Sequence, residues 1–350
     1  KLNSTSASGA VGIAFSLMAV IQACGFFFGQ GAGNNMSREL GHHEKERAEQ
    51  LAATGFFSAI LCGVLILVFG SIFLRPLTML LGSTETIAPY AMDYIRVILL
   101  GAPYMTASLV LNNLLRFQGN AFYGMLGLTS GGILNIVLDP IFIYGLHMGV
   151  RGAALATILS QGLSCIWVLR FLTGPKTLLR LKKENVRFRP ALILPCVALG
   201  TATFIMQASE SVISVCFNAS LLKYGGDLAV GAMTILSSVM QFAMLPLQGI
   251  AQGAQPISSY NFGAGSAQRV RQTFRLLLKV CLGYALVLWA CIQLFPGAFA
   301  RIFTPEPELV AFTAGMLRIY CGALFLMGIQ IACQMTFVSI GNAPCSIAVA

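Results

Sequence analysis

Long apolar stretches, interrupted by short polar segments, recur along the whole chain. A helix that spans a bilayer requires about 20 mostly apolar residues, and stretches of that length recur throughout the sequence. Some exceed one crossing, so tilted helices or helices that extend into the interface are expected. The pattern predicts an all-α, polytopic membrane protein. The predicted helices are 8–35, 53–80, 88–117, 121–145, 150–172, 191–222, 226–262, 270–297 and 308–340, with a further helix beginning at 344.

Composition supports this class of protein. Of the 350 residues, 57% are hydrophobic and 10% are charged, whereas soluble domains contain about 25% charged residues. No initiator Met precedes Lys1, and the last residues lie inside an apolar run. We therefore expect the chain to be truncated at both ends.

The net charge of +10 is distributed unevenly over the predicted loops. When loops are assigned alternately to two sides, one side carries most of the basic residues, which makes it cytoplasmic by the positive-inside rule. The excess charge therefore reports topology and does not indicate nucleic-acid binding; lipid contact by the run 182–189 is the alternative. The cytoplasmic set is Arg38, Lys45, Arg47, Arg116, Arg170, Lys176, Arg180, Lys182, Lys183, Arg187, Arg189, Arg269, Arg271, Arg275 and Lys279, and the opposite set is Arg75, Arg151, Lys223 and Arg301.

Neither cysteine nor histidine spacing indicates a metal centre. The ten cysteines are scattered singly without a CxxC pair, so a disulfide framework or zinc site is not indicated. His42 and His43 lie beside Glu44 and Glu46 in a charged loop. This group has two interpretations, a metal site or solvated surface, and its lack of ligand spacing favours surface.

The sequence repeats itself at a constant offset, which takes Gly31 to Gly253. Several distinctive positions coincide at this offset without a gap between them, which chance does not readily produce. The chain therefore divides into an amino-terminal half (1–173), a basic cytoplasmic linker (174–190) and a carboxyl-terminal half (191–350). The matching positions are Gly31–Ala32 with Gly253–Ala254, Ser37 with Ser259, Gly41 with Gly263, Arg47 with Arg269, Arg96 with Arg318, and Gly119–Asn120–Ala121 with Gly341–Asn342–Ala343.

Equivalent helices of the two halves point the same way, because Arg47 and Arg269 fall on the same side. The repeat is therefore parallel, with six helices per half and a pseudo-two-fold axis along the membrane normal. Secondary transporters with such repeats bind substrate near the bilayer midplane and alternate access between the two sides. The duplication predicts a secondary transporter.

Two acidic residues lie deep inside predicted helices, where charge is costly and marks ion or substrate paths. Asp139 precedes Pro140, and Glu210 lies in the stretch IMQASESVISVCFN. A structural alternative exists for each: Asp139 can bond backbone groups that the proline frees, and Glu210 can be a neutral carboxyl bonded to a neighbouring helix.

Asn135 and Asp139 lie four residues apart and share one helix face. Thr157 on the next helix can reach that face across a tight hairpin. An amide, a carboxylate and a hydroxyl supply oxygen ligands for Na⁺, or a network that tunes a proton site. We predict a cation-coupling site at Asn135, Asp139 and Thr157, with Glu210 as a further coupling residue, and no other metal site.

Polar amides recur at helical spacing on several predicted helices. Stripes of this kind suit a cavity that recognises varied organic molecules, although interhelical hydrogen bonding is the alternative. The predicted cavity residues are Gln22, Gln30, Asn34, Gln207, Gln241, Gln248, Gln252, Gln330 and Gln334, and Gln255 continues the stripe of Gln241, Gln248 and Gln252.

Motifs for ATP hydrolysis or other catalysis are not found. The stretch GQGAG at 29–33 lacks a following GK[ST] and lies in a membrane helix, so it is no phosphate loop. All three histidines lie in loops. The chain is therefore not an enzyme, and an ion gradient would supply energy, at about 2.3 kcal/mol for one charge moved through 100 mV.

Several stretches together resemble the multidrug and toxic compound extrusion (MATE) family, in particular the bacterial branch related to the staphylococcal efflux pump. They are GQGAGNNMSRELG, NIVLDPIFIYG, RGAALATILSQ, YGGDLAVGAMTILSS and LPLQGIAQGAQPISSYNFGAG. The resemblance covers essentially the whole chain. It implies twelve helices in two six-helix lobes, of which this chain holds helices 2–6, 7–10 and the start of 11.

The resemblance also implies roles for individual residues. Asn135, Asp139 and Thr157 match the family's amino-lobe cation network, and Glu210 matches an acidic residue on helix seven. The helix-one aspartate of many members would precede Lys1, and no acidic residue lies near Gln330, where some members have one on helix ten.

The predicted function is multidrug efflux from the bacterial cytoplasmic (inner) membrane, by antiport of organic, often cationic, compounds against Na⁺ or H⁺. No cofactor is expected besides the coupling ion. Small-molecule drugs and the lipid bilayer are the expected partners, nucleic acid is not, and the monomer is expected to be functional. The alternative is a related flippase for lipid-linked precursors or polysaccharides, but its pyrophosphate cavity favours several basic residues, and here only Arg96 and Arg318 enter the helices.

Overall fold

The computed structural model describes residues 5–81, 83, 85–175, 177–185 and 190–349. The side chains of 5–9, 183, 202–204, 206–215, 217–231 and 234 fall outside this description. Within the described part the secondary structure is helical, and six helices are long and apolar enough to cross a membrane, with a bent helix pair as a seventh candidate. The prediction of an all-α, polytopic membrane protein is confirmed.

Two compact units, Lys1–Thr201 and Ala202–Ala350, make up the chain, and each is described by itself. The predicted boundaries at 173/174 and 190/191 stay predictions. Unit 1 holds α1 (Thr5–Gly41), α2 (Lys45–Ile72), α3 (Leu74–Leu80), α4 (Ala88–Phe117), α5 (Ala121–Pro140), the π-helical η1 (Ile141–Gly145), α6 (Gly149–Thr173), the 3-10 segment η2 (Lys183–Asn185) and the first turns of α7 (Pro190–Gly263). Unit 2 holds the rest of α7, then α8 (Ala267–Leu294), α9 (Pro296–Phe303), α10 (Pro307–Tyr320), α11 (Leu324–Ser339) and α12 (Ala343–Val349).

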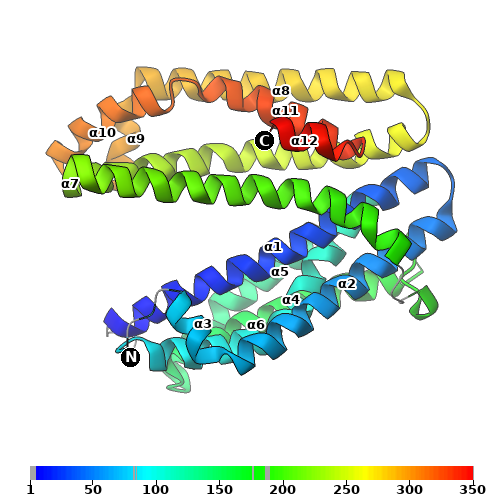
Figure 1. Ribbon diagram of the computed structural model, residues 1–350, viewed down its shortest axis with the longest axis horizontal. Coiled ribbons are helices and arrows are strands. Elements are labelled where there is room, and N and C mark those ends of the chain that lie inside the picture. The colour runs from blue at the N-terminus through cyan, green and yellow to red at the C-terminus, as the bar shows by residue number, and fades with distance from the viewer. Residues whose placement is uncertain (1–4, 82, 84, 176, 186–189, 350) are drawn as a thin grey trace. The chain divides into compact units, whose positions relative to one another are not determined.

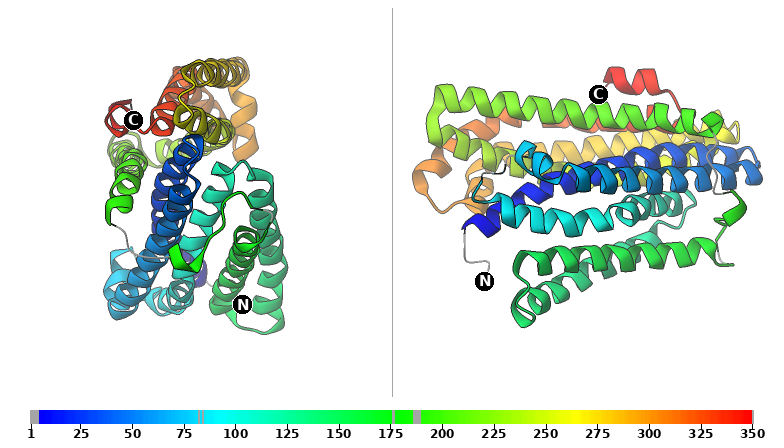
Figure 2. Two further views of the ribbon diagram at one scale, coloured as in Figure 1. Left: turned by 90° about the vertical axis from the view of Figure 1, so that its right-hand side faces the viewer. Right: turned by 60° about the horizontal axis from the view of Figure 1, so that its bottom comes forward.

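Helix α4 forms the centre of unit 1. It packs against α1, α2 and α6, and Figures 1 and 2 show these long helices side by side. Leu99, Leu111 and Leu114 of α4 are fully buried. Because helices inside a bilayer associate through close packing, this buried face makes α4 the helix around which the site residues are positioned.

The first turns of α7 cross α1 at backbone distance. At Gly31 an added Cβ would collide with the carbonyl oxygen of Cys196, so only glycine permits this crossing. Asn35 supports it by donating from Nδ2 to the Gly31 carbonyl (2.9 Å) and approaching the Cys196 thiol (4.0 Å). The glycine-rich stretch of α1 therefore serves helix packing here.

The basic segment after α6 is docked onto unit 1. Leu179 is 1% exposed and belongs to the same hydrophobic cluster as residues of α2 and α4. Thr177 donates to Gln118 Oε1 (2.8 Å), and the backbone N–H of Leu179 donates to the same oxygen (3.3 Å). The Lys182 ammonium lies 2.8 Å from the Glu49 carboxylate. These contacts fix the segment to the ends of α2 and α4.

Helix α7 covers both stretches predicted at 191–222 and 226–262, and it is helical from Pro190 to Gly263, 74 residues in all. A bilayer crossing needs about 20 residues, so α7 exceeds one crossing. Figures 1 and 2 show that its ribbon turns back on itself. This agrees with the basic residues that flank both of its ends, because an even number of crossings returns the chain to the same side.

Unit 2 contains a bent helix pair where the sequence predicted one helix at 308–340. The axes of α10 and α11 differ by 47°, and the bend frees backbone carbonyls that need hydrogen bonds inside a bilayer. Two side chains of α8 supply them: Trp289 Nε1 donates to the Gly322 carbonyl (2.8 Å), and Gln293 Nε2 donates to the Arg318 carbonyl (2.9 Å).

Helix boundaries repeat at the same constant offset that the sequence showed. The ends of α1 and α7, Gly41 and Gly263, coincide, as do both ends of α2 and α8 and the ends of α4 and α11. The turns coincide too: His43 (φ 63°) matches Gly265 (φ 70°), and Gly119 (φ 86°) matches Gly341 (φ 80°). A left-handed backbone at equivalent turns is a feature of two halves with the same local fold.

Candidate cation-coupling site

Asn135 and Asp139 lie one turn apart on α5, as their spacing predicted. Pro140 follows Asp139 directly and ends α5, and the chain continues as the π-helical segment η1. Proline lacks a backbone N–H and prevents a regular helical hydrogen bond at this turn. π-Helical turns occur frequently at functional sites, so the local backbone marks the Asp139 turn as a special position within the membrane-spanning stretch.

Two buried polar atoms at this turn lack hydrogen-bond partners among the described residues: Nδ2 of Asn135 and Oδ1 of Asp139. An unsatisfied buried polar atom costs about 1–3 kcal/mol. A proton or a cation bound to Asp139 would satisfy the carboxylate. Rotation of the Asn135 amide about its last side-chain bond exchanges its nitrogen and oxygen, so it can present either a donor or an oxygen ligand.

Thr157 lies on α6, which packs directly against α5. The chain reverses between η1 and α6 through two left-handed residues, His147 (φ 54°) and Gly149 (φ 58°), which produces the tight hairpin that the sequence predicted. The Thr157 hydroxyl donates to the Ala153 carbonyl (3.0 Å). Its single hydrogen is therefore used, and the Thr157 oxygen can act toward other groups only as an acceptor or a ligand.

Tyr94 of α4 joins this group, although the sequence analysis did not identify it. Its side chain is 5% exposed. The hydroxyl is in hydrogen-bond contact with Thr157 and lies close enough to Asp139 to experience its charge. Tyr94 of α4 therefore contacts α6 at Thr157 and lies within electrostatic range of Asp139 on α5. In the sequence, a tyrosine near the start of a predicted membrane helix is typical of an interfacial aromatic, which hid its role.

An ion pair beside Tyr94 ties the starts of α4 and α6 together. The Arg151 guanidinium lies 2.8 Å from the Asp93 carboxylate, with the two side chains 60% and 32% exposed. Exposed pairs of this kind contribute about 0–1 kcal/mol, so its importance is geometric. It joins α4, at the residue next to Tyr94, to the start of α6, the helix that carries Thr157.

The predicted amides of unit 1 differ in burial. Gln22 is exposed, whereas Gln30 and Asn34 are buried at 5% and 0% exposure. Gln30 Oε1 is a buried acceptor without a partner among the described residues. An unmet buried acceptor fits a residue that contacts substrate or water, and the cavity role of these three amides stays a prediction.

In unit 2 the burial of the glutamine stripe increases along α7: Gln241 is exposed, Gln248 and Gln252 are half-buried, and Gln255 is buried. Gln255 Nε2 donates to Met335 Sδ of α11 (3.0 Å). On α11, Gln330 donates to Gln334 Oε1 (2.9 Å) and to the Val349 carbonyl of α12 (3.3 Å). Gln255 and Gln330 therefore make contacts between helices, which fits the hydrogen-bonding alternative. The side chains of Gln207 and Glu210 lie outside the described residues.

An apolar cavity of about 790 Å³ lies between α2, α4, α5 and α6 of unit 1. Its lining includes Leu138 and Ile158, the chain neighbours of Asp139 and Thr157, and it contains no charged side chain. Tyr104, also in the lining, donates its hydroxyl to the Ile158 carbonyl (2.9 Å). The cavity therefore borders the turns of the coupling residues without contributing ionic ligands.

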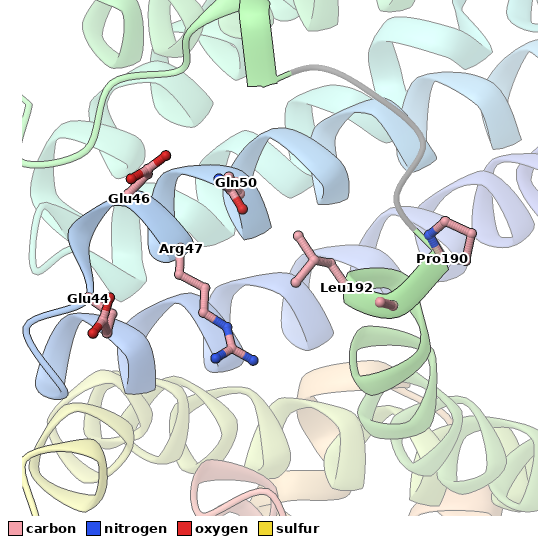
Figure 3. A pocket seen from close by; sticks show the side chains of 7 residues that line it. Glu44, Glu46, Arg47, Gln50, Pro190 and Leu192 are labelled. Atoms are coloured by element: carbon pink, nitrogen blue, oxygen red, sulfur yellow. The ribbon is translucent and has the colours of Figure 1, made fainter.

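A second cavity of unit 1, about 680 Å³, lies at the loop between α1 and α2. Figure 3 shows Leu192 on the first turn of α7 reaching toward residues of α2. This cavity contains both charge signs and none of the predicted site residues. Its lining is Glu44, Glu46, Arg47, Gln50, Pro190, Ala191 and Leu192.

Comparisons with known proteins agree on one family. The family model described as MatE matches residues 1–141 and 202–350. A multidrug export protein MepA of Staphylococcus haemolyticus (strain JCSC1435) is 26% identical over 321 residues, covering 91% of this chain and 70% of that protein. A crystal structure of MATE in the bent conformation superposes with a TM-score of 0.93 at 25% identity, covering 99% of this chain and 77% of the other. An outward-facing multidrug resistance MATE family transporter of the MOP superfamily gives a TM-score of 0.91 at the same identity and coverage.

Proposed function

Because the chain belongs to the MatE family, we propose that it exports structurally varied organic, often cationic, compounds in exchange for Na⁺ or H⁺ by alternating access. The multidrug export proteins among its relatives support this function. The resemblance seen in the sequence led to the same conclusion, and no observation favours the flippase alternative.

The observation that carries the coupling proposal is the pair of unsatisfied buried atoms at Asn135 and Asp139. These residues lie inside the membrane-spanning stretch Ala121–Gly145, where an acidic residue is costly unless it serves ion binding. Thr157 and Tyr94 add two hydroxyl groups to the same neighbourhood. The set offers oxygen ligands for Na⁺, or hydrogen-bond partners for a protonated Asp139.

The coupling cation and a cationic drug would be exchanged through charge at Asp139. A bound H⁺ or Na⁺ neutralises the carboxylate and satisfies Oδ1, and its departure restores a negative charge that favours a cationic substrate. Exchange of one coupling cation for one monovalent drug cation moves no net charge, so the concentration gradient of the coupling cation drives it. The membrane potential adds about 2.3 kcal/mol per 100 mV only for each coupling charge in excess of the charge on the drug. The gradient therefore drives export without a cofactor.

The carboxyl-terminal half contributes Glu210 as a second acidic group in this proposal. Glu210 lies in the helical backbone of α7, within a half whose helices repeat those of the first half. The substrate would contact the predicted cavity amides, at positions 22, 30, 34, 207, 241, 248, 252, 330 and 334. The protein would act as a monomer in the bacterial cytoplasmic membrane.

Full-length protein reconstituted into proteoliposomes tests the coupling. Efflux of a fluorescent organic cation such as ethidium is measured with a Na⁺ gradient alone and with a proton gradient alone. We expect one gradient to drive transport in the wild type, and Asp139→Asn to reduce gradient-driven efflux by tenfold or more, because a neutral amide cannot exchange a proton or balance a cation.

Glu85→Gln is the control, since Glu85 is an exposed acid paired with Arg75 outside the coupling group. It should retain efflux close to the wild-type rate. Unchanged efflux in Asp139→Asn, or equal losses in both variants, would contradict the assignment of Asp139 as the coupling residue. Transport by the wild type under neither gradient would contradict antiport itself.

A further inference from the structure

The first turns of α8 carry a polar stripe that none of the functions above uses. Gln268, Arg271, Gln272 and Arg275 follow spacings of three, one and three residues, so they lie on one face of the helix. All four side chains are exposed. Together with Ala267 they line a surface depression of about 360 Å³ along this one helix.

The positive charge of this stripe has no counter-ion in the neighbouring sequence. Between Asp227 and Glu306 the chain contains no acidic residue, and Glu306 follows α9, beyond the opposite end of α8. The ion pairs among the described residues involve arginine and lysine of unit 1 only. Because arginine stays protonated in proteins, Arg271 and Arg275 present two permanent charges to the surroundings.

The equivalent turn of the first half is built differently. At the constant offset between the halves, Arg271 corresponds to Glu49 and Gln268 corresponds to Glu46, while Gln272 corresponds to Gln50. Glu49 is 4% exposed and accepts the Lys182 ammonium at 2.8 Å. The first half therefore supplies its own charge partner within the protein, whereas Arg271 at the matching position takes part in none of the ion pairs among the described residues.

The other faces of α8 indicate where an external partner would lie. Leu277 and Cys281 are buried and pack against α11. Leu276 and Val280, in contrast, are large apolar side chains with 64% and 43% exposure, and α8 lies at an edge of the helices of unit 2 (Figures 1 and 2). Exposed apolar residues on a membrane helix face lipid.

A ligand that satisfies both features has a phosphate group beside the arginines and apolar chains beside Leu276 and Val280. The arginine fork binds phosphate oxygens in a bidentate manner, and the two glutamine side chains add donors. A zwitterionic lipid carries its own cation, which reduces its net attraction to two arginines, whereas an anionic lipid does not. Clusters of basic residues at the cytoplasmic end of a membrane helix recognise anionic lipids.

We propose that Gln268, Arg271, Gln272 and Arg275 at the start of α8 bind the headgroup of an anionic phospholipid in the cytoplasmic leaflet. The lipid's phosphate lies between the two arginines, and its acyl chains run along Leu276 and Val280. The bound lipid supplies negative charge beside the stretch 228–305, which contains no acidic residue. It anchors the cytoplasmic end of α8 at the membrane interface.

Native mass spectrometry of the delipidated full-length protein tests this site. Phosphatidylglycerol and phosphatidylcholine are titrated separately, and bound lipid is counted. We expect a saturable phosphatidylglycerol adduct that binds more tightly than phosphatidylcholine. Arg271→Gln with Arg275→Gln should weaken phosphatidylglycerol binding by roughly 25-fold, since each interfacial arginine contributes about fivefold, and should leave phosphatidylcholine binding unchanged.

Arg301→Gln removes an exposed arginine from the opposite end of unit 2 and is the charge-matched control, which should bind phosphatidylglycerol like the wild type. Arg271→Lys with Arg275→Lys keeps the charge and should retain most of the affinity, which separates charge loss from misfolding. Equal affinity for the two lipids, an equal loss in Arg301→Gln, or displacement of the lipid by millimolar inorganic phosphate would each overturn the proposal.

Discussion

Two tyrosine hydroxyls of α4 make different contacts with α6, and the difference distinguishes coupling from stability. Tyr94 contacts Thr157 beside Asp139, whereas Tyr104 donates to the Ile158 carbonyl (2.9 Å). We expect Tyr94→Phe to weaken the apparent affinity for the coupling cation about fivefold, because a hydrogen bond contributes about 1 kcal/mol. The measurement is the cation concentration that gives half-maximal efflux in proteoliposomes.

Tyr104→Phe serves as the comparison, since it removes one hydroxyl from the same helix. It should lower thermal stability slightly and leave the half-maximal cation concentration unchanged. If Tyr94→Phe left that concentration unchanged, or if both variants shifted it equally, Tyr94 would have no specific role at the site.

The sequence predicted part of this site because part of it is local. Asn135 and Asp139 are four residues apart, and helical geometry alone puts them on one face. Thr157 was within reach because a short hairpin connects its helix to theirs. Tyr94 was missed because its contact depends on how α4 crosses α6, and that crossing is fixed by tertiary packing around Ile98 and Leu99.

At the scale of elements, the bend between α10 and α11 depends on donors from a neighbouring helix. Trp289 Nε1 donates to the Gly322 carbonyl (2.8 Å). We expect Trp289→Phe to lower the free energy of unfolding by about 1 kcal/mol, because the carbonyl loses its partner in an environment without water. The thermal unfolding midpoint in detergent measures the change.

Trp167→Phe is the matched variant, since Trp167 is the other of the chain's two tryptophans. It stacks on Tyr123, with 5.2 Å between ring centroids, and phenylalanine preserves this stacking. A smaller loss is therefore expected. A midpoint for Trp289→Phe equal to that of the wild type would show that the bend does not depend on this hydrogen bond.

The docked segment after α6 gives a pH-dependent prediction. The Glu49 carboxylate accepts a hydrogen bond from the Lys182 ammonium, and this bond raises the pKa of Lys182 above its usual value. A raised pKa in the folded protein means that the stabilisation is complete below the unfolded value of about 10.4 and is lost as pH rises through the folded pKa. We expect Lys182→Gln to speed amide exchange at Leu179 and Leu181 near neutral pH.

The difference between Lys182→Gln and the wild type should shrink at alkaline pH, where Lys182 loses its charge. Arg180→Gln is the control, because it removes a charge from the same segment but keeps the backbone N–H that lies 3.4 Å from Glu49 Oε1. Equal exchange in Lys182→Gln and the wild type at neutral pH would argue against a stabilising ion pair.

Neither the bend between α10 and α11 nor the docked segment after α6 was evident from the sequence, for a common reason. The stretch 308–340 lacks a proline near 321–323, so its apolar pattern predicts one continuous helix, and the bend is stabilised from α8. The segment 174–190 has the composition of an exposed linker, yet Leu179 and Thr177 are buried against distant helices. Both features depend on partners far away in the sequence.

At the scale of the whole molecule, the internal repeat was predictable because identical residues recur at a constant offset in the two halves. Several helix ends and two left-handed turns of the first half recur in the second half at the same constant offset. What the repeat does not give is the chemistry of matching positions. Glu49 is paired inside the protein, while its counterpart Arg271 is exposed, so the two halves share a backbone and differ in charge.

Protease sites inserted into equivalent turns test whether the two halves have the same orientation in the membrane. A parallel repeat puts Gly119 and Gly341, which share a left-handed backbone, on the same side, and the basic loops make that side cytoplasmic. Sites at these two positions should be cut in inside-out vesicles only. Sites at Glu85 and Thr304, which follow α3 and α9, should be cut in right-side-out vesicles only. An inverted repeat has an odd number of crossings per half, so it would put the sites at Gly119 and Gly341 on opposite sides, and that result would contradict the parallel duplication.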